Sequence, residues 1–240
     1  MALKDIHADV VGSLLRPPEL LAAQKQLAEG AIARERFREI EDRAVDEAIA
    51  LQESVGLEIV TDGEMRRQSF QSQMVEAVSG FGEAGLNAFL WGEWRDGKGV
   101  YRIPRPARLG IAGRLVRKRY LSAGEFSYLK KKTAKISKIT LPSPGLWVNF
   151  WSREQKAYPT LDHFLADVAA ILRAEVAELV RLGAAYIQLD APHYGLLLDA
   201  RTRPFYEAQG WSLDRWLGAG VELENSVIGG FPAVTFGLHV

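Results

Sequence analysis

Polar side chains that can bind ligands or transfer protons follow several short apolar runs of this sequence, in widely separated parts of the chain. Carboxylates hold cations or move protons, hydroxyl and guanidinium groups bind carboxylates, and imidazole binds a metal or relays a proton. If the fold gathers these groups, they predict a site for a small polar ligand. The candidates are Ser13, Arg16, Asp62, Glu64, Ser143, Asp190, His193 and His239.

Several of these candidates also have a purely structural interpretation. Ser13 is suited to cap a following helix, and Asp62 is suited to begin a turn before a glycine. His193, close to a proline and a tyrosine, is suited to packing in a core, and so is His239. For these four residues both interpretations stay open at this point.

Glu64 and Asp190 favour a functional site more strongly. Glu64 comes just after the apolar run 57–62, and Asp190 ends the apolar run 185–190. A carboxylate buried beside such a run is costly unless a partner compensates its charge. We therefore expect both carboxylates to lie in a site where other polar groups, or a ligand, surround them.

Short apolar runs alternate with longer helical patterns along the chain. Alternating strands and helices predict a parallel α/β fold, and neither a Gly-x-Gly-x-x-Gly motif nor a phosphate loop is present. We expect the N-terminal part of a (β/α)₈ barrel with about five βα units, whose site lies at the carboxyl ends of the strands. The predicted strands are 8–13, 57–62, 138–141, 185–190 and 233–240, and the predicted helices are 18–30, 31–56, one from about 69, 160–183 and 212–227.

The segment 80–138 differs from the rest of the chain, because it combines glycine, proline, aromatic residues and many basic residues. We interpret it as an insertion after the second strand, containing a hairpin and a short helix, within a single domain that spans 1–240. Its basic residues form either a solvated surface or a docking surface for an anionic substrate tail.

Composition narrows the class of protein. Thirty basic residues balance thirty acidic residues, which argues against a general nucleic-acid or membrane-surface role. The N-terminus has no apolar core of a secretory signal, and no run of residues is long enough for a transmembrane helix. The absence of cysteine excludes disulfides and thiolate ligands from this chain. We expect a cytoplasmic enzyme that acts on small molecules.

Five short motifs, in order along nearly the whole chain, resemble those of cobalamin-independent methionine synthases and their short single-barrel relatives. Each motif is weak alone, and the set is fairly specific. The motifs are Val11-Gly12-Ser13-Leu14-Leu15-Arg16-Pro17, Val60-Thr61-Asp62-Gly63-Glu64-Met65-Arg66-Arg67, Leu141-Pro142-Ser143-Pro144 with Asn149-Phe150-Trp151-Ser152, Ile187-Gln188-Leu189-Asp190-Ala191-Pro192, and Gly237-Leu238-His239-Val240.

The resemblance implies a zinc-dependent transfer of a methyl group from a methyltetrahydrofolate to a thiol such as homocysteine. Zinc would hold the substrate as a thiolate, with His239 as the first metal ligand. Ser13 would help to hold the carboxylate of the amino acid, while Glu64 and Asp190 would hold its ammonium group.

The resemblance also implies further roles. Arg16 belongs to the first motif and would take part in substrate binding. Trp151 would lie against the pterin ring, although its spacing is more typical of a core residue. Asp190 or His193 would relay the proton that the departing amine requires.

Two departures from the family pattern leave alternatives open. The sequence stops after Val240, before the cysteine expected after His239, so we expect this chain alone neither to hold zinc tightly nor to turn over. A fragment or half-barrel with free sheet edges would self-associate or require a partner chain. Ala191 replaces a glutamate of the parent enzyme, which fits a relative that alkylates another thiol, such as a coenzyme M transferase. A decarboxylase of the uroporphyrinogen type would share the barrel without zinc.

Overall fold

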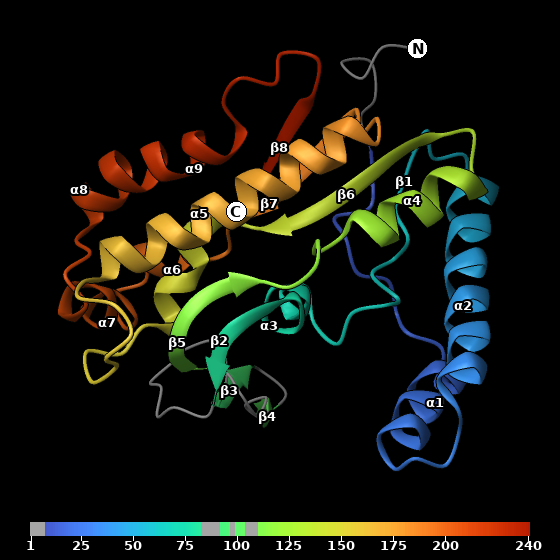
Figure 1. Cartoon of the computed structure of the whole chain (residues 1–240), viewed down its shortest axis with the longest axis horizontal. Helices are drawn as coiled ribbons and strands as arrows, with labels where there is room; N and C mark the ends of the chain where they lie inside the picture. The colour runs from blue at the N-terminus through green and yellow to red at the C-terminus, as the bar shows by residue number, and fades with distance from the viewer. Residues whose placement is uncertain (1–7, 83–91, 97–98, 104–109) are drawn as a thin grey trace.

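A parallel β-sheet lies at the centre of the computed structural model, which describes residues 8–82, 92–96, 99–103 and 110–240. The strands follow the order β1-β6-β7-β8, and each pairs in parallel with its neighbour (Figure 1). The prediction of an α/β fold with a parallel sheet is therefore confirmed. The four strands are β1 (Ile59–Val60), β6 (Ile136–Pro142), β7 (Tyr186–Asp190) and β8 (Thr235–His239).

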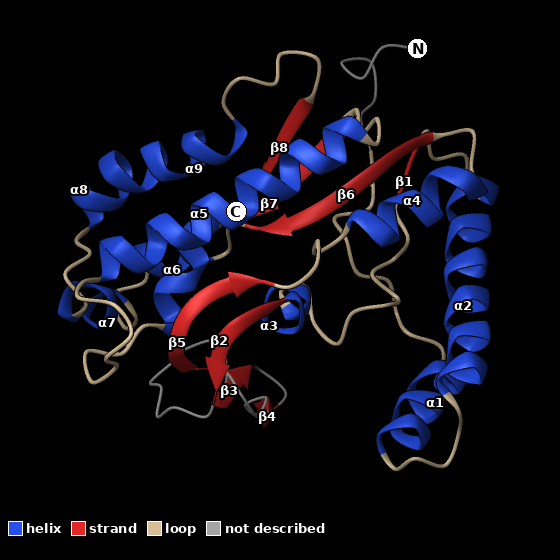
Figure 2. Cartoon of the chain, viewed as in Figure 1, coloured by secondary structure: helices blue, strands red, loops and turns tan. Residues whose placement is uncertain are grey.

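One row of helices packs alongside the sheet. Helix α2 contacts α4, α4 contacts α5 and β6, and α5 contacts α9. Figure 2 shows α5 and α4 passing in front of the long strand β6 and its neighbour β7. The row shields the apolar face of the strands from solvent. Its members are α2 (Arg34–Ser54), α4 (Ala123–Lys132), α5 (Leu161–Arg181) and α9 (Val221–Ile228).

Shorter helices complete the described fold. Helix α1 packs on α2, and the 3₁₀ helix η2 packs on α5 and α9. A π-helical turn, η3, continues directly from α8 into α9. These elements are α1 (Pro18–Ala28), α3 (Ser72–Ala77), η2 (Pro144–Phe150), α6 (His193–Leu198), α7 (Arg203–Ala208), α8 (Leu213–Arg215) and η3 (Trp216–Gly220).

The segment between β1 and β6 contains two antiparallel strand pairs and then α4. Strand β2 (Val78–Gly82) pairs with β5 (Gly110–Arg117), and β3 (Gly92–Asp96) pairs with β4 (Gly99–Ile103). Several basic residues of this segment form ion pairs with acids of the described fold, which favours the solvated-surface interpretation. The pairs are Arg114–Asp167, Arg119–Glu76, Lys132–Asp46 and Lys135–Glu58.

The two faces of the parallel sheet differ in polarity. Successive side chains of a strand point to opposite faces, and residues paired between parallel strands share a face. Thr140 pairs with Gln188, and Asp190 pairs with His239, so these polar side chains lie on one face. The intervening residues of β6 and β7 are apolar and buried: Ile139, Leu141, Ile187 and Leu189. The sheet therefore presents a polar face opposite the helices.

The prediction of a first strand at 8–13 is wrong, because this segment forms no strand in the structure. Side chains, rather than a strand ladder, hold its carbonyl oxygens. Lys138 Nζ donates to the oxygen of Val10, and Gln188 Nε2 donates to the oxygen of Val11 at 2.8 Å. Both donors belong to the polar face of the sheet, so the segment lies against that face instead of extending the sheet.

The second strand is shorter than predicted, and Gln52 of α2 supplies the reason. Its Nε2 donates to the backbone oxygen of Thr61 at 2.8 Å, and its Oε1 accepts from the Thr61 backbone N–H at 2.9 Å. A side-chain amide thus replaces a neighbouring strand at Thr61. The chain leaves the sheet there and turns toward Glu64.

The boundaries predicted for α5 are confirmed at both ends. Thr160 caps the helix, because its hydroxyl oxygen accepts from the backbone N–H of His163. Gly183 has φ +89°, the left-handed conformation in which glycine commonly ends a helix. Within the described ranges, no helix is both long and apolar enough to cross a membrane.

Replacement of Lys138 by methionine tests how the segment before Ser13 is anchored. The Lys138 side chain is fully buried, and its Nζ donates to Asp9 Oδ2 at 2.7 Å and to Gln188 Oε1 at 2.9 Å. Removing the ammonium leaves these acceptors unpaired, so we expect Lys138→Met to lower the free energy of unfolding by about 2–4 kcal/mol in urea titrations.

The matched control is Lys131→Met, because Lys131 is exposed on α4. It should change the stability by no more than about 0.5 kcal/mol. Equal stabilities for the Lys138 and Lys131 variants would contradict the anchoring role.

Candidate functional site

A cavity of about 300 Å³ opens at the carboxyl ends of β7 and β8. Asp190 is the last residue of β7, and His239 is the last residue of β8. Ser13 and Glu64 also line the cavity, although they come from segments remote in the sequence. The structure therefore brings together four of the residues proposed from the sequence. The remaining lining residues are Val11, Gly12, Phe70 and Pro192.

Glu64 is the most extensively bonded carboxylate of the cavity, and only 1% of its surface is exposed. Oε2 accepts a hydrogen bond from Ser13, and Oε1 accepts from Thr140 Oγ1 at 2.6 Å and from Arg67 at 3.1 Å. Its backbone has φ +54°, an uncommon conformation for a residue with a side chain. Gly63 before it is also left-handed, with φ +66°. This tight turn carries the carboxylate from the end of β1 into the cavity.

Arg67 connects Glu64 to a second buried carboxylate, Glu125. The guanidinium of Arg67 is completely buried and donates to Glu125 Oε2 at 3.0 and 3.1 Å. It also donates to Thr140 Oγ1 at 2.8 Å. Burial raises the pKa of Glu125 to about 7, although the neighbouring guanidinium opposes this shift. The sequence analysis missed this ion chain, because Arg67 and Glu125 lie 58 positions apart and no spacing signal relates them.

Asp190 and His239 form the second polar pair of the cavity. His239 Nδ1 lies 3.2 Å from Asp190 Oδ1, which also accepts from Gln188 Nε2 at 2.7 Å. Burial raises the pKa of Asp190, and the nearby charge of Glu64 raises it further. Two carboxylates that repel each other across a small cavity create a site that favours a bound cation.

The described residues do not fit a zinc site. His239 is the only imidazole that lines the cavity, and within the described chain no group of three His, Cys, Asp or Glu side chains is placed to hold a metal ion. A protein zinc site requires three or four ligands.

His193 and Trp151, two of the residues proposed from the sequence, are buried in the core and lie outside the cavity lining. His193 is fully buried and stacks between Tyr194 and Trp216, with ring centroids at 4.5 and 4.7 Å. Burial lowers its pKa to about 3, so it stays neutral and does not fit the role of a proton relay. Trp151 is 7% exposed and packs against Phe164 in the core, which corrects the expectation that it presents a face to a ligand.

Arg16 lies beside the site and stabilises its backbone. Its Nε donates to the carbonyl oxygen of Arg67 at 3.0 Å, and a terminal nitrogen donates to the carbonyl oxygen of Glu64 at 3.1 Å. Arg16 is absent from the cavity lining. In the structure Arg16 thus holds the turn after β1 in place beside the cavity, and its part in substrate binding stays a prediction.

A further buried carboxyl, Glu224 of α9, lies beside the end of β6. Ser143, the hydroxyl residue noted after the third predicted strand, donates to Glu224 Oε1, and no described residue hydrogen-bonds Oε2. Burial raises the pKa of Glu224 to about 7. Sequence analysis passed over this carboxyl, because Glu224 occurs within an ordinary amphipathic helix.

Glu224 makes the stability of the fold depend on pH. Its pKa is higher in the folded chain than the ordinary value of 4.5, so folding favours the protonated carboxyl. This contribution is fully present below about pH 4.5 and is lost as pH rises toward 7. Relative to Glu224→Gln, we expect the wild-type chain to lose about 3 kcal/mol of unfolding free energy across this window, measured by urea titration at several pH values.

The exposed neighbour Glu222 provides the control, since Glu222→Gln should leave the wild-type pH dependence unchanged. Parallel stability curves for wild type and Glu224→Gln would show that this carboxyl is not desolvated.

Gly12 offers a direct test of the packing around Glu64. A Cβ atom at position 12 would lie 2.7 Å from Glu64 Oε1 and 3.4 Å from Thr140 Cγ2. We expect Gly12→Ala to displace the carboxylate and to lower the free energy of unfolding by about 1–3 kcal/mol, as overpacking does in well-packed interiors. Chemical denaturation measures this change.

Gly124→Ala is the matched control, because a Cβ there meets nothing within 4 Å and the position lies in α4. This variant should be as stable as wild type or more stable, by up to about 1 kcal/mol. A neutral Gly12→Ala would contradict the close approach.

Comparisons with known proteins agree with this architecture. The structure of a putative vitamin-B12-independent methionine synthase from Listeria monocytogenes superposes with a TM-score of 0.72 at 23% identity, covering 98% of this chain and 65% of that one. The methionine synthase of Pyrococcus abyssi is 30% identical over 80% of this chain. The 5-methyltetrahydropteroyltriglutamate–homocysteine methyltransferase of Thermosynechococcus vestitus is 27% identical over 91% of it.

The chain spans 53% of the length of the Pyrococcus protein and 28% of the Thermosynechococcus protein. The family model for the catalytic domain of cobalamin-independent synthases matches residues 7–215, which is most of the chain. This chain therefore belongs to the family of the cobalamin-independent synthase catalytic domain.

Proposed function

We propose that this chain forms part of a methionine synthase site, which transfers a methyl group from a methyltetrahydrofolate to a thiol such as homocysteine. The observation that carries the proposal is that Glu64 and Asp190 line one small cavity together with Ser13 and His239. The names of the relatives from Pyrococcus and Thermosynechococcus support the choice of reaction and of methyl donor.

The two carboxylates suit the ammonium group of an amino acid. Glu64 is already fixed by Thr140 and Arg67, so its position is set before a ligand arrives. Asp190 uses Oδ1 for Gln188 and His239, and no hydrogen bond from a described residue reaches Oδ2. A cation between the two carboxylates would relieve their mutual repulsion, and charge-assisted hydrogen bonds of this kind are the strong ones. Ser13, exposed at the cavity, would contact the amino-acid carboxylate.

In the proposed transfer, the acceptor thiol gives up its proton, its sulfur forms a bond to the methyl carbon, and the bond from that carbon to N5 of the folate breaks. N5 takes the electron pair of the broken bond and then requires a proton. Asp190 lines the cavity, so it is the group placed to relay this proton. His193 is unsuited, because it is buried outside the cavity and has no ionisable proton near neutral pH.

The proposal extends to the architecture around the site. We infer that 1–240 contributes to one (β/α)₈ barrel domain and that 80–138 is inserted into it. Strand β8 pairs only with β7 among the described strands, so further strands or a partner chain would extend the sheet at that edge. The family resemblance adds a cytoplasmic location and small-molecule partners to the proposal. It also adds zinc, for which the described residues offer only His239, so the other ligands would have to come from elsewhere.

Amino-acid binding tests the role of the carboxylates without requiring turnover. We expect L-methionine to bind the wild-type chain in isothermal titration calorimetry, and its analogue 4-(methylsulfanyl)butanoate, which lacks the ammonium group, to bind at least tenfold more weakly. Glu64→Gln and Asp190→Asn should each weaken methionine binding by about tenfold or more, since each removes a charged hydrogen-bond acceptor.

The same two variants should leave the binding of the analogue unchanged, which separates loss of an ammonium contact from general damage to the cavity. Asp199→Asn is the control, because this acid pairs with Arg201 outside the cavity. Equal affinity of wild type for methionine and for the analogue would refute the proposed role of the carboxylates.

A further inference from the structure

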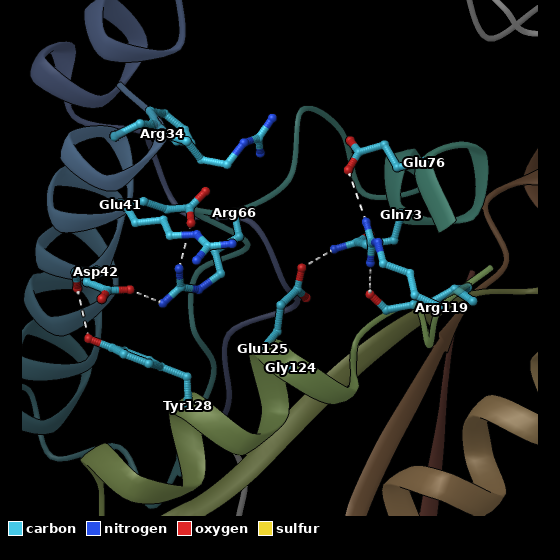
Figure 3. A pocket seen from close by; sticks show the side chains of 13 residues that line it. Arg34, Glu41, Asp42, Arg66, Gln73, Glu76, Arg119, Gly124, Glu125 and Tyr128 are labelled. Carbon is cyan, nitrogen blue, oxygen red and sulfur yellow. Dashed lines mark hydrogen bonds and ion pairs between the residues drawn. The ribbon is translucent and has the colours of Figure 1, made fainter. Parts of the chain in front are cut away.

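A second cavity, of about 440 Å³, lies between α2 and α4 and shares no lining residue with the first. Figure 3 shows its facing walls, with Arg34, Glu41 and Asp42 on α2 and with Glu76 and Arg119 opposite. Four arginines and four acids contribute to the lining, so their pairing decides which charge remains for a ligand.

Every acid of this cavity has a guanidinium partner. Arg66 binds Glu41 at 2.6 Å and Asp42 at 2.5 Å, so one arginine compensates two acids. Arg66 also lies over the ring of Tyr128 and is fixed there. The two remaining pairs are Glu125 with the buried Arg67 at 3.0 Å and Glu76 with Arg119 at 3.4 Å. Partners for the acids are thus provided within the protein.

Arg34 and Arg38 differ from the other arginines of the cavity. They lie one turn apart on α2, both line the cavity, and neither forms a hydrogen bond or an ion pair with any residue that the structure describes. Helix α2 begins at Arg34, and no side chain caps this end. The unpaired N–H groups of a helix N-terminus add positive potential, which Glu35 in the first turn partly offsets. The same end of the cavity therefore carries two guanidinium groups outside any ion pair, although Arg38 is close enough to Glu41 to interact with its charge.

The cavity also offers an apolar surface next to these charges. Phe37 lies on α2 between the two arginines, and Leu121 and Tyr128 contribute from the opposite side. Phe37 and Tyr128 are half-buried, and Leu121 is buried. A ligand that matches both the arginines and this apolar surface would carry an oxyanion at one end and an apolar or aromatic body at the other.

We propose that the cavity between α2 and α4 binds a small organic oxyanion, a carboxylate or a phosphate ester, through Arg34 and Arg38, with its apolar body against Phe37. Both chemistries match a guanidinium fork, which binds planar or tetrahedral oxyanions through paired N–H groups. The proposal is independent of the methyl-transfer site, because none of its residues lines that cavity.

Isothermal titration calorimetry with benzoate and phenyl phosphate, at constant ionic strength, tests this site. We expect at least one of them to saturate the wild-type chain with a Kd below about 1 mM, and inorganic phosphate to bind more weakly because it lacks the apolar body. Preference for benzoate identifies a carboxylate ligand, and preference for phenyl phosphate identifies a phosphate ester. The double variant Arg34→Ala/Arg38→Ala should weaken binding at least tenfold.

Arg36→Ala is the matched control, because Arg36 lies on the same helix, is exposed, pairs with Glu39 and does not line the cavity. This variant removes one positive charge from the same helix and should bind as wild type does. The proposal is overturned if neither ring-bearing anion saturates the chain by about 10 mM, or if Arg36→Ala weakens binding as much as the double variant. All three arginines are exposed, so the variants should keep their helices. Circular dichroism would check this.

Discussion

The buried carboxylate of Glu64 is the interaction on which the arrangement of the site depends. A carboxyl group with 1% exposure is stable only when its oxygen atoms have hydrogen-bond partners, and here three segments supply them. Ser13 reaches it from the N-terminal segment, Thr140 from β6, and Arg67 from the turn after β1. Because each donor must be in place, the Glu64 side chain keeps its position only when all three segments are correctly placed relative to one another.

The buried side chains on the polar face of the sheet also depend on hydrogen-bond partners. Lys138, Thr140, Gln188 and Asp190 are buried on β6 and β7, yet each forms hydrogen bonds within the described fold. Their partners include the carbonyl oxygens of the segment before Ser13, which therefore needs no strand pairing of its own. A buried polar face costs free energy unless it is saturated in this way, and saturation leaves few alternative positions for the segment. This explains how an irregular segment delivers Ser13 and Gly12 to a defined place.

The parts of the fold that depend on interactions between residues close in sequence could be predicted from the sequence. The parallel strands and the cap and stop of α5 follow from periodicity, hydroxyl capping and glycine, and the gathering of Glu64, Asp190 and His239 follows from their places at or just after strand ends. The failures involve long-range contacts. Segment 8–13 has the composition of a strand, but side chains from β6 and β7 take its carbonyl groups. Trp151 and His193 follow site-like motifs, but aromatic packing buries them. The Arg67–Glu125 pair has no local signature at all.

The contacts of Arg67 affect the order in which parts of this chain fold. Its guanidinium joins the turn after β1 to α4 and to β6, across chain separations of 58 and 73 residues. Contacts between such distant positions form late in folding, because closing long loops costs entropy before the contacts can compensate it. The Glu64 carboxylate should thus acquire its final geometry only after the turn after β1, α4 and β6 have come together. Partly folded chains would already possess helices and apolar clusters while lacking the complete cavity around Glu64.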